Sequence, residues 1–277
     1  MNISKPNTKL IFTDLDGTFL STKNFSYGDN IELVNKITNF GNIVIFNSSK
    51  TFIEIKNFLS QNNLKIPFIC ENGGGIYTPR NFFPSGIYNS KDAYDVISEF
   101  PQISSEIGKL KDLLPDEFLK NIIFFRSLSI EEKMYYSGLS ESDLNFAEKR
   151  VHTELVIWKS DSILLSRFAN FLENIDLTIS KGGRFYHISH LHNKLQAMNI
   201  LVNEFKKYYP TNSYTTIALG DSYNDIDMLN NVDIACLIKN ENYSDLVKKI
   251  KSPILIKSKL IAPDAWKECI DKLNILN

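Results

Sequence analysis

Short apolar runs alternate with amphipathic segments at both ends of this 277-residue chain. The elements predicted near the amino terminus are strands at 9–13, 42–46 and 67–70 and helices at 30–40 and 51–60. After residue 190 the predicted elements are a helix at 195–205 and strands at 216–219, 233–237 and 254–257. Alternation of this kind is typical of βα units, in which helices connect the strands of a parallel sheet. The two ends of the chain therefore predict a shared α/β fold.

A middle segment of different texture separates these two halves. It contains the aromatic pairs Phe82-Phe83, Phe124-Phe125 and Tyr135-Tyr136 and predicted strands at 122–127, 154–159 and 184–188. We expect residues 84–189 to form an inserted α+β domain. Residues 1–83 and 190–277 are then expected to form a core domain with a Rossmann-like parallel sheet.

Charge and cysteine content narrow the classes of partner. With 31 basic and 32 acidic residues the net charge is −1, so no overall field attracts nucleic acid or an anionic membrane. No apolar run approaches the roughly 18 residues of a membrane span, and the apolar stretch near the amino terminus is too short for a signal peptide. Cys70, Cys236 and Cys269 are far apart and have apolar neighbours, which favours reduced thiols in the cytoplasm. We expect no nucleic-acid partner and no membrane partner.

Two aspartates follow the first predicted strand, in the sequence Asp14-Leu15-Asp16-Gly17-Thr18. Residues i and i+2 of an extended chain project to the same side, so Asp14 and Asp16 face one ligand. Adjacent carboxylates repel unless a cation binds between them or they share a proton. Mg²⁺ takes carboxylate and phosphate oxygens, and a carboxylate nucleophile divides phosphoryl transfer into two easier steps. A solvated Asp-Gly turn is the alternative, whereas a calcium loop fits badly because Phe19 stands where its glycine is needed.

A second acidic group, Gly220-Asp221-Ser222-Tyr223-Asn224-Asp225, follows the strand predicted at 216–219. Ordinary helix capping explains Asp225 well. It does not explain why another strand also ends in paired acids. A third carboxylate at the same edge of the sheet would complete an oxygen-rich magnesium site.

Two further residues are candidates for holding phosphate. Ser48 ends the second predicted strand, where its hydroxyl and the next N–H groups can bind phosphate oxygens at a helix start. Lys194 immediately precedes the helix predicted from Leu195, where the helix dipole disfavours a cation by roughly 0.3–1 kcal/mol. A nearby anion explains a lysine at such a position. Taken singly, Ser48 is equally well explained as a helix cap and Lys194 as a solvated charge.

The order Asp14-x-Asp16-Gly-Thr, Ser48, Lys194 and Gly220-Asp221-Ser-x-Asn-Asp225 resembles the haloacid dehalogenase superfamily. The resemblance implies that Asp14 is the nucleophile, that Asp16 is the general acid and base, and that Ser48 and Lys194 hold the phosphoryl group. It also implies a Mg²⁺ cofactor bound by Asp14, the main-chain carbonyl of Asp16, and Asp221, with Asp225 as a direct or indirect supporter. The insert would be a cap domain that closes over the site and excludes water.

Finer features resemble the mannosyl-3-phosphoglycerate phosphatase family, which includes glucosyl-3-phosphoglycerate phosphatases. They are Ser48 to Thr51, Pro67 to Gly74, Gly138 to Ser140, Arg150 to Trp158, Lys181 to Phe185, and Pro263 with Trp266. The sequence departs from the family at Leu155, where proline is common, and around Lys194, where an Asp-Lys-Gly or Gly-Lys-Gly pattern is usual. The resemblance implies hydrolysis of mannosyl- or glucosyl-3-phosphoglycerate, a small phosphorylated sugar acid, to the glycosylglycerate and phosphate. The residues expected in substrate binding are Ser48, Lys50, Asn72, Gly73, Arg150, Glu154, Gly182, Gly183, Arg184 and Lys194.

Several alternatives remain open from the sequence. The Arg184 guanidinium suits a planar glycerate carboxylate, but a glycine-rich hairpin with a solvated arginine is the simpler interpretation. A zinc site at His187, His190 and His192 is disfavoured because no cysteine lies nearby. The competing activities are a sucrose-phosphate or other sugar-phosphate phosphatase and a phosphomutase. A ligand-binding regulator without turnover is disfavoured, since it has no need of a nucleophile beside a general acid.

Overall fold

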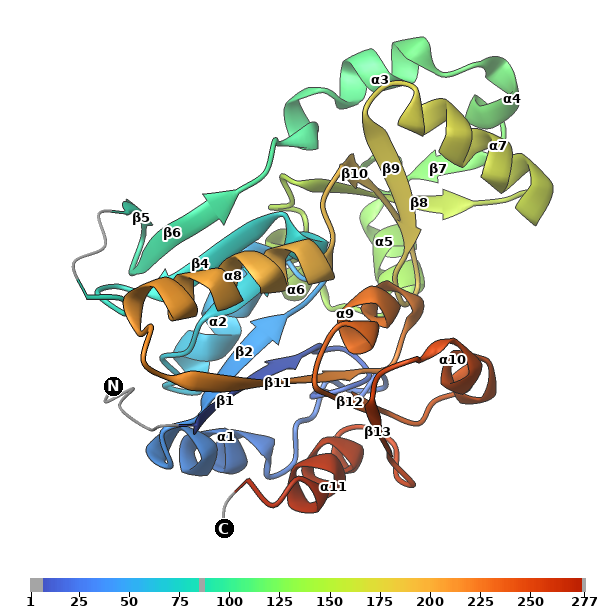
Figure 1. The fold of residues 1–277 in the computed structure, drawn as a ribbon. Helices are drawn as coiled ribbons and strands as arrows, with labels where there is room; N and C mark the ends of the chain where they lie inside the picture. Colours follow the sequence, from blue (N-terminus) through green and yellow to red (C-terminus); the bar gives the residue numbers. More distant parts are fainter. Residues whose placement is uncertain (1–6, 85–87, 276–277) are drawn as a thin grey trace.

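Two β-sheets organise the computed structural model, which describes residues 7–84 and 88–275 (Figure 1). The larger sheet has nine strands in the order β13-β12-β11-β1-β2-β3-β4-β6-β5. Its strands are β1 (Asn7–Thr13), β2 (Ile43–Asn47), β3 (Phe68–Cys70), β4 (Gly75–Pro79), β5 (Asn89–Lys91), β6 (Tyr94–Glu99), β11 (Ser213–Gly220), β12 (Ile234–Leu237) and β13 (Ile254–Lys257). Pairing is parallel from β13 to β3 and antiparallel from β3 to β5.

Helices cover both faces of this larger sheet. The helices are α1 (Asn30–Asn39), α2 (Phe52–Gln61), α8 (Lys194–Tyr208), α9 (Ile226–Asn230), α10 (Tyr243–Lys249) and α11 (Asp264–Lys272). Apolar residues of α1, α2 and α11 pack with Ile11 on one face, and those of α8, α9 and α10 pack with Leu10 and Phe12 on the other. Burial on both faces is typical of a parallel sheet. In the described part of the chain, no helix is long and apolar enough to cross a membrane.

The smaller sheet has four antiparallel strands in the order β7-β8-β10-β9. These strands are β7 (Ile122–Phe124), β8 (Thr153–Trp158), β9 (Leu177–Lys181) and β10 (Tyr186–His190), and the helices near them are α3 (Ile107–Leu113), α4 (Asp116–Leu119), α5 (Ile130–Ser137), α6 (Glu141–Ala147) and α7 (Ser162–Glu173). Phe118, Val156 and Phe168 belong to a separate apolar cluster of this part, as expected of a unit with its own core. Below, the nine-stranded sheet with its helices is called the core, and the four-stranded sheet with its helices the cap. The predicted fold class, an α/β core with an inserted α+β domain, is confirmed.

The extent of the insert differs in detail from the prediction. Residues 89–99, expected in the insert, form β5 and β6 and extend the larger sheet. The strand predicted at 184–188 begins two residues later, because Gly182 and Phe185 close the β9–β10 hairpin through a backbone hydrogen bond of 3.0 Å. The division at residues 84 and 189 stays a prediction. Residues 1–6, 85–87 and 276–277 of the predicted segments lie outside the described residues.

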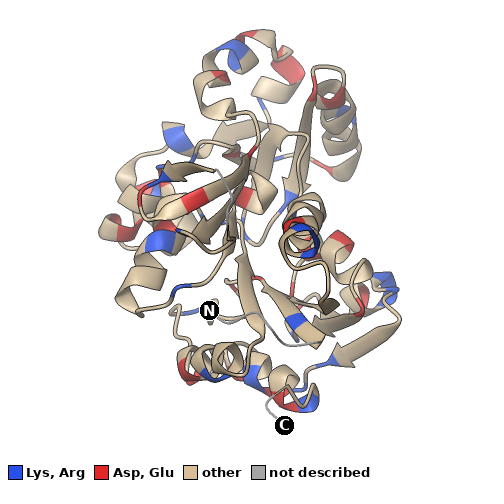
Figure 2. Ribbon diagram, turned by 60° about the vertical axis from the view of Figure 1, so that its left-hand side comes forward, with Lys and Arg blue, Asp and Glu red and all other residues tan. Residues whose placement is uncertain are grey.

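Acidic and basic residues are interspersed over both parts of the ribbon (Figure 2). Exposed pairs such as Lys36–Glu32 and Lys267–Asp29 contribute little to stability because water screens them. Buried charges are the exception, since removing an unpaired ion from water is costly. Asp14, Lys194, Asp221 and Asp225 are buried together where β1 and β11 end.

Candidate active site

The acidic motifs meet at the carboxyl edge of the larger sheet. β1 and β11 are parallel neighbours with Thr13 opposite Leu219, so Asp14 and Asp221 follow the two strands at nearly the same level. The Asp14 N–H donates to the Leu219 carbonyl at 3.0 Å. The carboxyl ends of parallel strands are where α/β proteins bind ligands.

Gly17 allows the turn after β1 to approach Asp221 closely. Its φ of +85° lies in the left-handed region, and a Cβ at this position would stand 2.4 Å from the Asp221 Oδ2. The next residue, Thr18, donates its hydroxyl to the Asp221 Oδ1 at 3.0 Å. The Asp-x-Asp-Gly-Thr sequence therefore supplies two carboxylates and also the turn that orients a third.

Lys194 joins the two halves of the sequence at this site. It is the first residue of α8, and Asn193 caps that helix by accepting the Gln196 N–H. The buried Lys194 Nζ lies 2.7 Å from both the Asp14 Oδ1 and the Asp225 Oδ1. Burial disfavours the ammonium, but attraction to these two carboxylates outweighs burial and raises the pKa of Lys194 above its usual value. Asp14 and Asp225 are thus the anions that a lysine at a helix start requires.

Asp14, Asp221 and Asp225 form a cluster of the size that holds a metal ion. One carboxylate oxygen from each lies within 4.8 Å of the others, and all three residues are buried. Burial, followed by repulsion from Asp225, raises the pKa of Asp14 from 3.8 to about 7 despite Lys194. Burial and the charges of Asp14 and Asp225 likewise raise the pKa of Asp221. Three acids beside one ammonium leave an excess of buried negative charge, and these hard oxygen donors fit a divalent cation.

Asp225 also shapes the turn that carries Asp221. Its Oδ2 accepts the N–H groups of Asp221 at 3.1 Å and Ser222 at 3.0 Å. Asn240, which follows β12, donates from Nδ2 to the Asp221 Oδ2 at 3.1 Å. Sequence reasoning missed Asn240, because nothing in its local pattern marks the contact.

Asp16 pairs with a second cation that also lines the cavity. Its Oδ2 lies 3.0 Å from the Lys50 Nζ, and Lys50 is also 3.6 Å from the Glu54 Oε1. Within the described part of the chain, the Asp16 Oδ1 has no hydrogen-bond partner. Asp16 therefore has one carboxylate oxygen held in place and another available for a proton or a ligand.

Ser48, Asn72 and Gly73 lie beside these residues with different surroundings. Ser48 directly follows β2, and its hydroxyl accepts the Lys50 N–H at 3.2 Å. The Asn72 N–H donates to the Ser48 carbonyl at 2.9 Å, and the Asn72 Oδ1 accepts from the Asn224 side chain at 2.9 Å. Gly73 packs against α8, since a Cβ there would lie 2.3 Å from the Asn193 carbonyl oxygen. This contact gives a packing reason for the glycine; its expected substrate role stays a prediction.

A cavity of about 160 Å³ lies between the core and the cap. The core contributes Asp14, Asp16 and Asp221 to its lining, and the cap contributes Phe125, Leu155, Gly183, Arg184, Phe185 and His187. The Arg184 guanidinium donates to the Ser137 carbonyl within the cap and to the Thr22 carbonyl of the core, the latter at 3.2 Å. Gly183 has open space where a Cβ would be, whereas a Cβ at Gly182 would lie 2.5 Å from the His187 Nε2. Of the two glycines, Gly183 is the one that faces the cavity.

Arg150 and Glu154 have different hydrogen-bond partners, and of the two only Arg150 lines the main cavity. The Arg150 Nη1 donates to the Ser49 carbonyl at 2.9 Å and to the Thr153 hydroxyl at 2.7 Å, while the side chain lines the cavity. Glu154 pairs with Arg126 at 2.5 Å and faces a neighbouring cavity of about 370 Å³, which Arg150 also lines. Burial raises the pKa of Glu154 although Arg126 opposes the rise. The structure thus brings Arg150 to the main cavity and Glu154 to an adjoining one.

Comparison with known proteins gives the family. The haloacid dehalogenase-like hydrolase family matches residues 11–255. A glucosyl-3-phosphoglycerate/mannosyl-3-phosphoglycerate phosphatase of Persephonella marina is 30% identical, over 94% of this chain and 95% of its own. A mannosyl-3-phosphoglycerate phosphatase of Pyrococcus furiosus is also 30% identical, over 87% of this chain and 99% of its own.

Solved structures agree with this placement at the level of the fold. A phosphatase of the haloalkanoate enzyme superfamily from Bacteroides thetaiotaomicron superposes with a TM-score of 0.67 at 14% identity, over 98% of this chain and 97% of its own. At that identity the likeness concerns the fold alone. From the matched segment and the relatives, this chain belongs to the haloacid dehalogenase-like hydrolases, within the mannosyl-3-phosphoglycerate phosphatase family.

Proposed function

We propose that the chain hydrolyses mannosyl- or glucosyl-3-phosphoglycerate to the glycosylglycerate and inorganic phosphate, through an aspartyl-phosphate on Asp14. The observation that carries the proposal is the buried cluster of Asp14, Lys194 and Asp221 beneath a cavity that also contains Asp16. The names of the relatives supply the substrate class.

In the first step the Asp14 carboxylate attacks phosphorus and the bond from phosphorus to the glycerate oxygen breaks. Lys194, 2.7 Å from Asp14, orients the attacking carboxylate and offsets the charge of the phosphoryl oxygens. Asp16 gives a proton to the departing alkoxide. Lys50, 3.0 Å from the Asp16 Oδ2, fixes this carboxyl group so that its other oxygen faces the leaving group.

In the second step Asp16 takes a proton from water, which attacks the same phosphorus and releases phosphate and the free Asp14 carboxylate. We propose Mg²⁺ as the cation, held by Asp14, Asp221 and the main-chain carbonyl of Asp16, with Asp225 as a ligand or as the support of Asp221. When bound, Mg²⁺ would neutralise charge on the transferring phosphoryl group. Ser48 and Lys50 are proposed to hold phosphate oxygens beside Lys194.

Recognition of the distal half of the substrate is proposed to come from the cap. A glycerate carboxylate would accept from the Arg184 guanidinium, which already donates to two backbone carbonyls, and from the exposed backbone at Gly183. Sugar hydroxyls would reach Arg150 and Glu154, whose Nε and Oε1, respectively, have no hydrogen-bond partner among the described residues. The apolar lining from Phe125, Leu155 and Phe185 excludes water from the reacting atoms.

A phosphate-release screen with Mg²⁺ tests this substrate assignment. The panel contains mannosyl- and glucosyl-3-phosphoglycerate, sucrose-6-phosphate, mannose-6-phosphate and 3-phosphoglycerate. We expect the highest kcat/KM on a glycosyl-3-phosphoglycerate. Preference for sucrose-6-phosphate or mannose-6-phosphate would contradict the assigned substrate. Exchange between phosphate isomers without release of phosphate would identify a phosphomutase.

A further inference from the structure

Glu71 is a fully buried carboxylate outside the catalytic cluster, at the junction between the core and the cap. It follows β3 in a short 3₁₀ turn, Glu71–Gly73, and does not contribute to the cavity that contains Asp14. A buried carboxylate is retained only where donors replace the water it loses. The partners of Glu71 therefore indicate what it does.

The donors to the Glu71 carboxylate are consecutive residues of the cap. Its Oε2 accepts the N–H groups of His152 and Thr153, each at 2.8 Å, and the Thr153 hydroxyl at 3.0 Å. The Val151 N–H donates to the Oε1 at 3.1 Å, and the Arg150 Nη1 lies 4.0 Å away. These residues lead into β8, the strand at whose start Glu154 stands. One core carboxylate thus fixes the beginning of a cap strand.

The backbone of Glu71 also binds the loop after β2, which carries Ser48 and Lys50. Its N–H donates to the Lys50 carbonyl at 2.8 Å, and the N–H of Asn72 donates to the Ser48 carbonyl at 2.9 Å. Glu71 and Asn72 both have positive φ, +49° and +57°, a conformation that costs a non-glycine residue of order 1 kcal/mol. The surrounding contacts must impose it. Glu71 therefore links the cap to the loop that carries Ser48 and Lys50.

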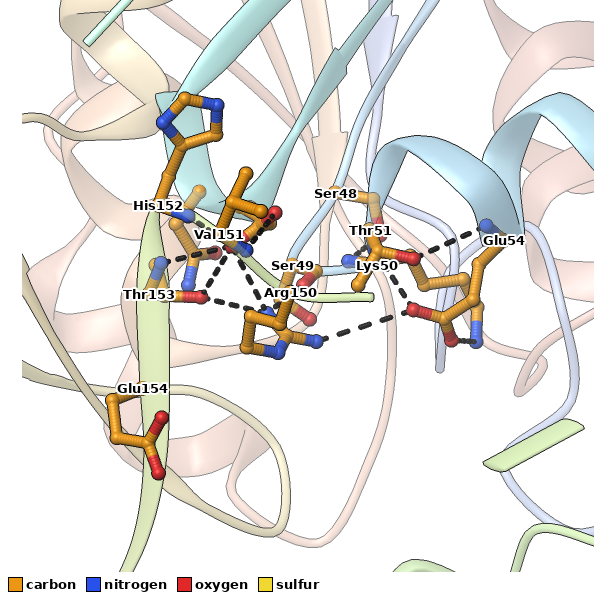
Figure 3. A network of polar contacts seen from close by, with 12 residues as sticks. Ser48, Ser49, Lys50, Thr51, Glu54, Arg150, Val151, His152, Thr153 and Glu154 are labelled. Atoms are coloured by element: carbon orange, nitrogen blue, oxygen red, sulfur yellow. Dashed lines mark hydrogen bonds and ion pairs between the residues drawn. The ribbon is translucent and has the colours of Figure 1, made fainter. Parts of the chain in front are cut away.

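Further hydrogen bonds join the cap to the residues that follow β2. Figure 3 shows Arg150 between Ser49 and Thr153, with hydrogen bonds to both, while Glu154 points away from the network. The Thr51 hydroxyl also donates to the Phe146 carbonyl at 3.0 Å. At the returning connection from cap to core, the His192 ring lies 3.2 Å from the Glu71 carbonyl.

We propose that Glu71 is a positioning residue, whose carboxylate fixes the start of β8 on the core and so holds the cap in register with Asp14 and Lys50. This inference rests on the proposed function, because it assigns to Glu71 the alignment of the distal half of the substrate. Glu71 itself does not touch the substrate. Its side chain aligns the cap, whereas its backbone bonds to the core loop survive a change of side chain.

The test compares Glu71→Gln with the wild type on two substrates. A neutral amide that offers one acceptor cannot satisfy the N–H groups of three residues, so the cap shifts, and a misplacement of about 1 Å costs up to about a hundred-fold in rate. We expect kcat/KM on the preferred glycosyl-3-phosphoglycerate to fall about ten- to a hundred-fold, and that on p-nitrophenyl phosphate, which has no distal half to align, to fall less than about threefold. The matched control is Glu268→Gln, because Glu268 also accepts backbone N–H groups, those of Lys259 and Leu260, but lies in α11.

A second measurement does not depend on the substrate. Hydrogen exchange of the amides of Val151, His152 and Thr153 should accelerate about tenfold or more in Glu71→Gln, with no change there in Glu268→Gln. Unchanged protection, or equal losses on the two substrates, would overturn the positioning role. If the wild type hydrolyses p-nitrophenyl phosphate but none of the glycosyl phosphates, the proposed substrate fails while the exchange experiment still decides the role of Glu71. If Glu71→Gln does not fold, Glu71→Asp, which keeps the charge but is one methylene shorter, must show the same order of effects.

Discussion

At the residue scale, the chemistry depends on where charge is buried. Asp14 and Asp225 contact the buried Lys194 ammonium, and the buried Asp221 lies beside these two carboxylates. Such a cluster is unstable in electrostatic terms unless a further cation joins it, since burial and the neighbouring carboxylates raise the pKa of Asp14 and of Asp221. The same excess of negative charge suits the site to a divalent cation.

Replacing the proposed nucleophile should abolish turnover without unfolding the protein. In Asp14→Asn the amide cannot form an acyl phosphate, while Lys194 keeps its partner Asp225 at 2.7 Å. Asp16→Asn should lower the rate by about 10²–10⁴, the usual contribution of a positioned acid or base. Phosphate release measures the turnover of each variant, and far-UV circular dichroism measures whether the variant is folded. Near-normal activity of Asp14→Asn would require another nucleophile.

The metal-free protein should lose stability as the pH rises. Because burial raises the pKa of Asp14 from 3.8 to about 7, the folded chain holds a proton that the unfolded chain has lost between about pH 4 and pH 7. The stability that this proton provides is complete below about pH 4 and is lost as the pH passes about 7. A divalent cation binds the deprotonated carboxylates and so restores the stability that the metal-free protein loses at high pH.

Thermal unfolding with and without Mg²⁺ checks this pH dependence. We expect the gain in Tm from Mg²⁺ to be larger at about pH 8 than at about pH 5.5, and free Mg²⁺ at 100 Kd to stabilise by about 2.7 kcal/mol. Asp221→Asn should abolish most of the gain. A gain that is the same at both pH values would show that the cluster is already ionised without metal.

The sequence correctly predicts that the acidic residues following two different strands lie close together. Asp14 and Asp221 could be predicted as neighbours because each directly follows an apolar strand, and parallel strands end at one edge. Glu71 and Asn240 could not be found in this way. Their contacts, to the cap and to Asp221 respectively, depend on how distant segments approach each other in three dimensions.

At the element scale, the glycines after β3 determine how closely the cap approaches. A Cβ at Gly74 would lie 2.3 Å from the His152 Cβ, and one at Gly73 would lie 2.3 Å from the Asn193 carbonyl oxygen. Both cap connections therefore pass over backbone that has no side chain. Within the run 71–75, Asn72 and Gly73 were expected to bind substrate, and the structure gives Gly73 and Gly74 a packing role.

Gly74→Ala should destabilise the protein because the added methyl group overlaps His152. Overpacking of this kind costs about 1–3 kcal/mol, which a urea titration reports as a lower midpoint. Gly108 in α3 is the matched control, since a Cβ there would have no atom of the described residues within 4 Å. Gly108→Ala should raise stability by up to about 1 kcal/mol, because alanine loses less backbone entropy on folding. Equal midpoints for wild type and Gly74→Ala would contradict the close approach.

The parallel strands could be predicted from the sequence, and the antiparallel strands β5 and β6 at one end of the larger sheet could not. β1 contains the buried apolar run Leu10–Phe12, and β2 is wholly buried and apolar except for Asn47, a clear signal of a parallel sheet. β6 has the sequence YDVISE and is mostly half-buried, while β5 has only three residues. Short antiparallel edge strands bury too little apolar surface to leave a pattern. This is the physical reason why residues 89–99 were expected in the insert.

At the scale of the whole molecule, the active-site cavity belongs to neither part alone. Its acidic floor comes from the core, and Phe125, Leu155 and Arg184 come from the cap. The sequence predicts both parts, but their relative placement depends on contacts such as Glu71 with β8 and Arg184 with Thr22. These contacts involve residues more than about 80 positions apart, so local patterns carry no record of them.

Arg184 is the residue by which the glycerate assignment is tested across both parts. A charge-assisted, bidentate contact contributes roughly 1.5–3 kcal/mol, so Arg184→Ala should lower kcat/KM on the glycosyl-3-phosphoglycerate by about one to two powers of ten. The contact to the Thr22 carbonyl is exposed and contributes little, so its loss should have a small effect on any substrate, whereas loss of carboxylate binding affects only the glycerate substrate. Activity on p-nitrophenyl phosphate, which has no carboxylate, should therefore barely change. Arg184→Lys should recover only part of the loss, because a point charge cannot reproduce the planar fork of donors. Equal losses on both substrates would mean that Arg184 holds the cap against the core and that the carboxylate of the substrate binds elsewhere.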